Sequence, residues 1–414
     1  LMSFVVNNRT YDPPNRPLVI ICLDGSADEY FDAALDRGLM PHLQDIASGG
    51  YRGLARGALP SFTNVNNAAI VTGVPPAVTG ISGNYFLDPE TGQEVMMNDA
   101  SYLRCPTILA AAARSGRHVG MVTAKDKLRG ILSSDLDGIA ISVEKAAEID
   151  LTIHGFTTAE DLVGEPHPDI YSADASLYVL KTGVALLAHD LADFLYLSTT
   201  DYIQHSFAHD EPGALAFYEQ IDLQLGKLRA IGADIAITAD HGMNAKQRSD
   251  GSPNVIYLES ELVAKFGDGI NVLLPITDPY VVHHGALGSF ATIHLPPEQD
   301  ADTVGSFIAR LDGITEVHHR DRAIQLLELP GDRIGELVAL SARDVVIGKT
   351  PEHHDLSVLE GTLRSHGGRY EEMVPMILSS PLSEAYTQKA RADLRNFDIF
   401  DVVCNGRAGG RADG

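Results

Sequence analysis

Short apolar runs alternate with helix-like stretches along most of this chain, and this alternation limits the fold more than any other feature. The run at residues 18–23 is continuous and β-branched, which is typical of a strand buried on both faces of a sheet. Further strands are predicted at 52–59, 118–123, 194–198, 234–238 and 374–378, and helices at 41–47, 63–72, 106–114, 173–189 and 213–230. Such alternation predicts an α/β fold, a three-layer α/β/α sandwich around a mainly parallel sheet.

A segment in the second half of the chain departs from this alternation. Between residues 251 and 349, strand-like pieces at 291–295, 315–317 and 337–340 surround a helix-like stretch at 301–311. A chain of 414 residues is too long for one small core and suits a large domain with a smaller insert. We therefore predict a core domain formed by residues 1–250 and 351–414, with an α/β cap inserted at 251–350.

The chain is acidic, with a formal net charge of −25, and this argues against nucleic acid and anionic membranes as partners. An anionic small substrate would be repelled too, unless bound metal ions supply positive charge at the site. No apolar run is long enough to span a bilayer, and residues 1–17 lack the pattern of a signal peptide. The three cysteines are sparse, which indicates a reducing compartment, so a cytoplasmic location is expected. The sequence is compatible with a homodimer.

Three aspartates come directly after predicted strands. Asp24 follows the first strand, Asp201 follows the strand at 194–198, and Asp240 follows the strand at 234–238. The carboxyl ends of parallel strands meet at one edge of a sheet, where ligands bind. A single acidic residue after a strand is usually a turn residue. Three of them, each next to a histidine or a helix start, predict a cluster of carboxylates.

Three histidines extend this cluster. His205 lies four residues after Asp201, so on a helical turn both side chains share one face. His241 directly follows Asp240, and His366 lies before two glycines that let a loop approach closely. A lone histidine among the sixteen of this chain is more often a core or surface residue than a ligand. As a set, the imidazoles and carboxylates predict a site for Zn²⁺ or for Mn, Fe or Co ions.

The candidate nucleophile is Thr63, which begins the predicted helix at 63–72. A threonine at this place is ordinarily only a helix cap. Beside a metal cluster, however, a helix N-terminus favours negative charge, and a coordinated hydroxyl loses its proton readily. Ser61 is the alternative nucleophile.

Two lysines and an asparagine are candidate substrate ligands. Lys125 and Lys127 follow the strand at 118–123, and in extended chain residues two apart face the same side. Spacing alone is explained as well by a solvated basic loop. Asn84 is a candidate amide donor to a phosphoryl oxygen, and beside Gly83 it is explained equally by a turn.

Several other histidines do not fit the pattern of strand ends. His209 could extend the cluster at His205, but we interpret it as neither a ligand nor a support for one. The pairs His283-His284 and His318-His319 fall in the predicted insert and are interpreted as surface residues, and His353-His354 is expected near the return of the insert to the core.

The ordered set of Asp24, Thr63-Asn64, Asp201-x3-His205, Asp240-His241-Gly242 and His366-Gly367-Gly368 resembles the alkaline phosphatase superfamily, in its nucleotide pyrophosphatase/phosphodiesterase branch. The resemblance runs over nearly the whole chain. It implies two zinc ions, one held by Asp201, His205 and His366 and the other by Asp24, Asp240, His241 and Thr63.

The resemblance also implies a reaction. With Asn84, Lys125 and Lys127 on the substrate, it implies a hydrolase that cleaves the P–C bond of phosphonoacetate to acetate and phosphate through a phosphothreonine at Thr63. Here Lys125 and Lys127 grip the carboxylate and stabilise the leaving group. Three alternatives are open: a phosphodiesterase or nucleotide pyrophosphatase with the same metals, a phosphosugar mutase of the superfamily, and a catalytically silent binding module of this fold.

Overall fold

The computed structural model describes residues 2–276 and 287–409, and it confirms the predicted α/β sandwich. Its centre is a seven-stranded sheet in the order β4-β19-β10-β3-β9-β7-β8. The five strands from β10 to β8 are mutually parallel, and β19 runs antiparallel to both its neighbours. The strands are β3 (Leu18–Cys22), β4 (Tyr51–Arg56), β7 (Val119–Thr123), β8 (Ile139–Ser142), β9 (Phe194–Ser198), β10 (Asp234–Thr238) and β19 (Met373–Leu378).

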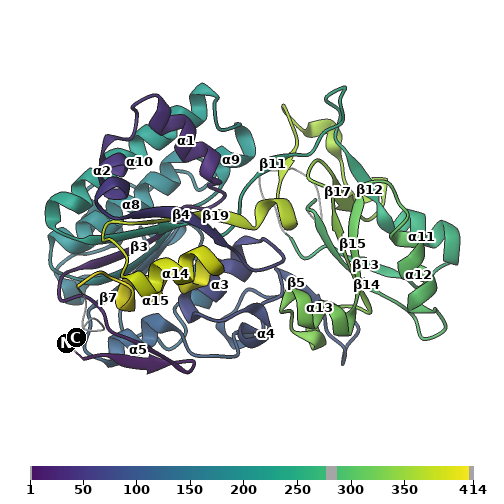
Figure 1. Ribbon diagram of the computed structural model, residues 1–414, viewed down its shortest axis with the longest axis horizontal. Helices are drawn as coiled ribbons and strands as arrows, with labels where there is room; N and C mark the ends of the chain where they lie inside the picture. Colours follow the sequence, from purple (N-terminus) through teal and green to yellow (C-terminus); the bar gives the residue numbers. More distant parts are fainter. Residues whose placement is uncertain (1, 277–286, 410–414) are drawn as a thin grey trace.

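Helices cover both faces of this sheet, as the two layers in Figure 1 show. One layer holds α1 (Asp28–Asp36), α2 (Pro41–Gly49), α8 (Ala173–Ala188) and α10 (Pro212–Ile231). The other holds α3 (Thr63–Thr72), α5 (Ile108–Arg114), α6 (Asp126–Leu132) and α15 (Ile399–Asn405). In β3, Leu18, Ile20 and Cys22 pack into the second layer, whereas Val19 and Ile21 pack into the first. This explains why the strand is apolar at every position.

Four adjacent strands end in the same row. Cys22 at the end of β3 pairs with Thr238 of β10 and with Ser198 of β9, and Ser198 pairs in turn with Thr123 of β7. The residues that follow these four strand ends are therefore delivered to one edge of the sheet.

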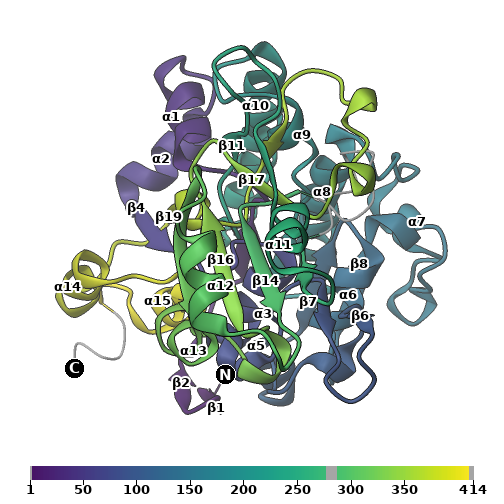
Figure 2. The ribbon, with the colours of Figure 1, turned by 90° about the vertical axis from the view of Figure 1, so that its right-hand side faces the viewer.

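Residues 255–276 and 287–348 form a second structural unit beside the sandwich. A four-stranded antiparallel sheet in the order β13-β14-β16-β15 packs against α11 and α12, as seen from the side of this unit in Figure 2. Its elements are β12 (Val255–Tyr257), α11 (Leu258–Phe266), β13 (Asn271–Leu273), β14 (Phe290–His294), α12 (Ala301–Ile308), β15 (Ile314–His319), α13 (Arg320–Leu327), β16 (Leu337–Ser341) and β17 (Val346–Gly348). We call this unit the insert. The chain leaves the core through β11 (Asn244–Ala245) and returns through β18 (Arg364–Ser365), and these two strands pair.

Shorter elements complete the chain. They are β1 (Phe4–Val6), β2 (Arg9–Tyr11), α4 (Pro76–Thr79), β5 (Tyr85–Leu87), β6 (Glu94–Met96), α7 (Ala159–Val163), α9 (Tyr202–Ser206) and α14 (Glu384–Ala392). In the described part of the chain, no helix combines the length and apolarity needed to cross a bilayer.

One local expectation was wrong. Lys125 and Lys127 do not lie in extended chain, because α6 begins at Asp126 and Lys125 is its N-cap residue. The side chain of Asp126 accepts hydrogen bonds from Arg129 and Ser142, both at 2.7 Å, and these bonds hold the first turn in place. The prediction that both lysines face the same side therefore rested on an extended backbone that the structure does not have.

Candidate functional site

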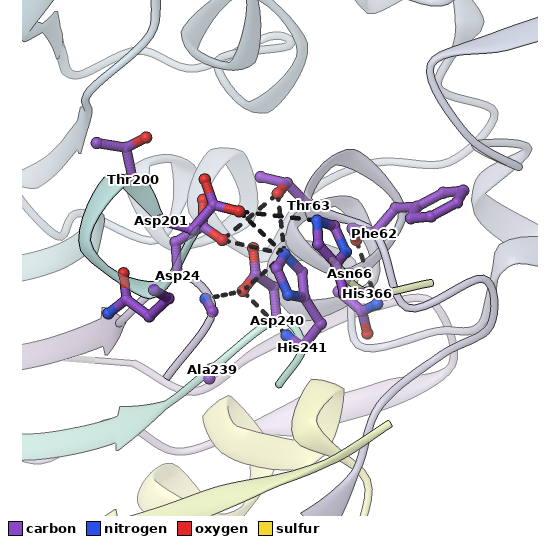
Figure 3. A network of polar contacts seen from close by, with 12 residues as sticks. Asp24, Phe62, Thr63, Asn66, Thr200, Asp201, Ala239, Asp240, His241 and His366 are labelled. Atoms are coloured by element: carbon purple, nitrogen blue, oxygen red, sulfur yellow. Dashed lines mark hydrogen bonds and ion pairs between the residues drawn. The ribbon is translucent and has the colours of Figure 1, made fainter. Parts of the chain in front are cut away.

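Six predicted metal ligands converge beyond the aligned strand ends and form two groups. Asp201, His205 and His366 form one, and Asp24, Asp240 and His241 form the other. Figure 3 labels Asp24, Asp201, Asp240, His241 and His366 of this set. Within each group the three ligand atoms lie within 4.8 Å of one another, and all six residues are buried. These groups are the same two triplets that the resemblance implies.

The distances within the groups are short. His205 Nε2 lies 2.9 Å from Asp201 Oδ2, and His241 Nε2 lies 3.1 Å from Asp24 Oδ1. The two groups are in contact, because the rings of His241 and His366 stack with their centroids 3.5 Å apart and their planes 3° apart. A pair of bound cations would therefore be close neighbours.

The backbone fixes the tautomer of all three histidines. The Nδ1 atoms of His205, His241 and His366 lie 2.7–2.8 Å from the carbonyl oxygens of Arg364, Gly242 and Ser61, respectively. A carbonyl only accepts hydrogen bonds, so each Nδ1 must carry the proton. With Nδ1 carrying the proton, each Nε2 is the nitrogen that faces the cluster and would bind a cation, as in a metal-ligating histidine.

The electrostatics of the ligand set also fit cations. Burial raises the pKa of Asp24 well above its usual range, and the carboxylates of Asp201 and Asp240 raise it further. Burial lowers the pKa of His366 well below its usual range, so its ring is neutral. Within the described residues, the basic groups in contact with these aspartates are histidine rings and not lysines or arginines. Divalent cations would compensate the buried carboxylates, so the two groups could each hold one metal ion.

Thr63 begins α3 and points its hydroxyl at the second group (Figure 3). Its Oγ1 lies 3.3 Å from His241 Nε2 and 3.5 Å from Asp24 Oδ1. Ser61, the alternative nucleophile, has another role. Its hydroxyl donates to the carbonyl of Gly368 at 2.9 Å and accepts from the amide of Gly367 at 3.0 Å, so it holds the loop that follows His366.

A cavity of about 340 Å³ opens over the cluster. Most of the predicted set lines it: Asp24, Thr63, Asn84, Lys125, Lys127, Asp201, His205 and His366. Asp240 and His241 are fully buried and lie outside the lining. The structure thus brings Asn84 and both lysines to the same cavity as Thr63.

Two residues near this cavity were not predicted from the sequence. Glu144 lines the cavity, and its Oε2 accepts the backbone amide of Asp126 at 2.8 Å, so it caps the helix turn that carries the lysines. Asn67 lies one turn after Thr63 in α3 and donates to the carbonyl of Thr63 at 2.9 Å and to Asp240 Oδ2 at 3.3 Å. Both act through contacts between segments far apart in sequence, for which the sequence holds no local signal.

The other histidines weighed as candidates lie outside the cluster where the structure describes them. His209 packs edge-on against Tyr30, His318 contacts Glu316, and the His354 ring accepts the amide of Lys349. His283 and His284 lie outside the described residues.

Comparisons with known proteins place this site in context. Residues 18–369 match the model of the family described as type I phosphodiesterase / nucleotide pyrophosphatase. Solved structures of phosphonoacetate hydrolase from Sinorhizobium meliloti, in complex with phosphonoformate and with phosphonoacetate, are 45% identical to this chain with a TM-score of 0.92. The similarity covers 98% of this chain and 99% of those chains.

More distant relatives share the fold. Murine ectonucleotide pyrophosphatase/phosphodiesterase 5, in an inactive form with AMP, has a TM-score of 0.62 and 16% identity over 94% of each chain. A pyrophosphatase/phosphodiesterase of Schizosaccharomyces pombe, itself uncharacterised, is 25% identical over 242 residues, which are 55% of this chain and 44% of that protein.

Proposed function

This chain belongs to the type I phosphodiesterase / nucleotide pyrophosphatase family, and we propose that it hydrolyses the carbon–phosphorus bond of phosphonoacetate to acetate and phosphate. One observation carries the proposal: a single cavity joins a hydroxyl beside two buried metal-binding groups with a pair of lysines. The metal groups suit a phosphonate and the lysines suit a carboxylate, and phosphonoacetate carries both.

The proposed metal ions are two Zn²⁺, one held by Asp201, His205 and His366 and the other by Asp24, Asp240, His241 and Thr63. Their nitrogen and oxygen ligands suit zinc, and manganese, iron or cobalt would also be accepted. When bound, such cations lower the pKa of a hydroxyl and stabilise negative charge on phosphoryl oxygens.

Thr63 acts as the nucleophile in this proposal. Its hydroxyl releases a proton to solvent, and Oγ1 then attacks phosphorus, so that an O–P bond forms while the P–C bond breaks. The electron pair leaves on the acetate carbon, which takes a proton from solvent. Water then attacks the phosphothreonine, the bond between Oγ1 and phosphorus breaks, and phosphate is released with the hydroxyl of Thr63 restored.

The leaving group is the difficult part of this reaction, because it departs as a carbanion. Lys125 and Lys127 would bind the carboxylate and spread the developing charge as an enolate. Asn84 would donate a hydrogen bond to a phosphoryl oxygen. Glu144 keeps the lysine-bearing turn fixed through the amide of Asp126.

The first test is an assay of the purified, metal-quantified protein. We expect equimolar phosphate and acetate from phosphonoacetate, loss of turnover after chelation, and recovery on adding zinc. A protein carrying two metal ions that releases no phosphate from phosphonoacetate would overturn the proposed function. Faster turnover of an aryl phosphodiester would favour the phosphodiesterase alternative.

The lysines provide a prediction about specificity. Lys127→Ala is expected to lower kcat/KM for phosphonoacetate by roughly tenfold, the order expected for one charged hydrogen bond, with a smaller loss on an aryl phosphate ester that has no carboxylate. Lys145→Ala is the matched control, because Lys145 pairs with Glu148 and is not among the residues that line the cavity. Equal losses on both substrates would remove Lys127 from the carboxylate site.

A further inference from the structure

An arginine of the insert is buried against the core. Arg333 ends the short turn Gly331–Arg333 and is only 9% exposed. Its guanidinium donates to the carbonyl oxygens of Gly80 and Tyr102, the latter at 2.9 Å. It also lies over two aromatic rings, 5.1 Å from the centroid of Phe86 and 5.6 Å from that of Tyr102.

The two carbonyl groups lie at the two ends of one segment of the chain. Residues 81–101 leave the core after Gly80, form the hairpin of β5 and β6, and return at Tyr102. We call this segment the wall hairpin, because it supplies Asn84, Tyr85, Met96, Met97 and Asn98 to the lining of the cavity. One guanidinium therefore bridges both ends of the segment that forms one side of the cavity.

Asn84 is held by contacts inside and outside this hairpin. Its backbone N–H donates to the carbonyl of Pro275 in the insert at 2.6 Å, and its backbone carbonyl accepts the N–H of Met97 at 2.7 Å. Phe86 and Met97 pack together in a small apolar cluster at the base of the hairpin. The position of the Asn84 backbone therefore depends on the position of the hairpin relative to the insert.

The chemistry of this contact is specific to arginine. Burial and the neighbouring Arg104 lower the pKa of Arg333, so placing a charge there is unfavourable unless the contacts compensate. A planar guanidinium can donate to two carbonyls and lie flat against aromatic faces at once, and the compact, more strongly hydrated ammonium of lysine fits such a site less well. Among the described residues, the carboxylate nearest in sequence, Asp332, pairs with Arg104 instead.

We propose that Arg333 is a positioning residue, which clamps the ends of the wall hairpin and thereby holds Asn84 against the phosphoryl group. The inference rests on the proposed function, because it assigns the insert a part in substrate binding. The insert then acts on the cavity by holding the wall hairpin in place, and the clamp affects the reaction through Asn84.

A double-mutant cycle tests this route. Arg333→Met is expected to lower kcat/KM for phosphonoacetate by roughly 10- to 100-fold, since small misplacements of a binding group cost about that much. Asn84→Ala should lose a similar factor, and the double variant should lose no more than Asn84→Ala alone. Multiplied losses in the double variant would overturn the clamp, because a purely structural role would act independently of Asn84.

Further variants and measurements complete the test. Arg333→Lys should recover part of the loss, and exogenous guanidinium should raise the activity of Arg333→Met if that variant is impaired. In Arg333→Met, hydrogen exchange should be faster across residues 81–102 and unchanged in α3. The metal content of Arg333→Met and Arg333→Lys should equal that of the wild type. Arg104→Met is the matched control, because its exposed ion pair with Asp332 lies beside the clamp.

The outcomes separate the two proposals. Wild-type protein inactive on phosphonoacetate would overturn the proposed function, while hydrogen exchange would still test the clamp. Exchange at residues 81–102 that matches the wild type in Arg333→Met would overturn the clamp alone.

Discussion

Thr63→Ala is expected to abolish phosphate release from phosphonoacetate while the protein stays folded and keeps metal ions. The hydroxyl that lies 3.3 Å from His241 Nε2 and 3.5 Å from Asp24 Oδ1 is the group that we propose as the nucleophile, because it can form a covalent phosphoryl intermediate while the Asp and His side chains hold the metal ions. Removing a catalytic nucleophile costs up to about 10⁶-fold, so we expect a loss on the order of 10⁴-fold or more. The six Asp and His ligands remain, so metal content measured by mass spectrometry should stay near wild type.

Thr63→Ser is the matched control, since it keeps a hydroxyl at the same position. It should retain measurable turnover, whereas Thr63→Ala should not. Acid quenching of the wild type during turnover should trap a phosphoryl group on the peptide that contains Thr63. Activity of Thr63→Ala within tenfold of the wild type would show that another group attacks phosphorus.

Lys246→Met is expected to cause the largest loss of stability, about 3–5 kcal/mol, which is the usual cost of breaking a buried ion pair by removing one partner. Lys246 and Glu371 are both fully buried, with Nζ 3.2 Å from Oε1. The same Nζ donates to Ser289 Oγ and to the carbonyl of Arg343, both at 2.8 Å. The substitution would leave the carboxylate of Glu371 buried without its cation.

This ion pair also links the two metal groups. The carbonyl of Glu371 accepts the amide of Gly242 at 2.7 Å, next to His241, and its carboxylate accepts the amide of Gly368 at 3.4 Å, near His366. We therefore expect weaker metal binding in Lys246→Met, together with a lower urea midpoint at fixed metal concentration.

A second substitution identifies the cause of the loss. Lys246→Met combined with Glu371→Gln should regain much of the stability, because no unpaired buried charge remains. Lys145→Met is the surface control and should leave the midpoint nearly unchanged, since its pair with Glu148 is exposed. A single Lys246→Met variant as stable as the wild type would show that the pair does not hold these loops.

The core elements with strong local patterns were predicted most closely. The bounds of α3, β9 and β10 agree with the structure, because continuous apolar runs and flanking turn residues determine such elements locally. The edge strand β8 and the short helix α6 were missed. Both are short and partly polar, so packing against β7 rather than local propensity decides them.

The sequence by itself determined the chemistry of this protein: which carboxylates, imidazoles and hydroxyl come after which strands. Their position at one site can be predicted from the sequence, because parallel strands deliver the residues at their carboxyl ends to one edge of the sheet. Only the tertiary structure decided how those groups work together. The register that aligns Cys22 with Ser198 and Thr238, the carbonyls that fix each histidine tautomer, and the reach of Arg333 into the core all join residues far apart in the chain. Such contacts arise from packing between segments, and no local pattern encodes them.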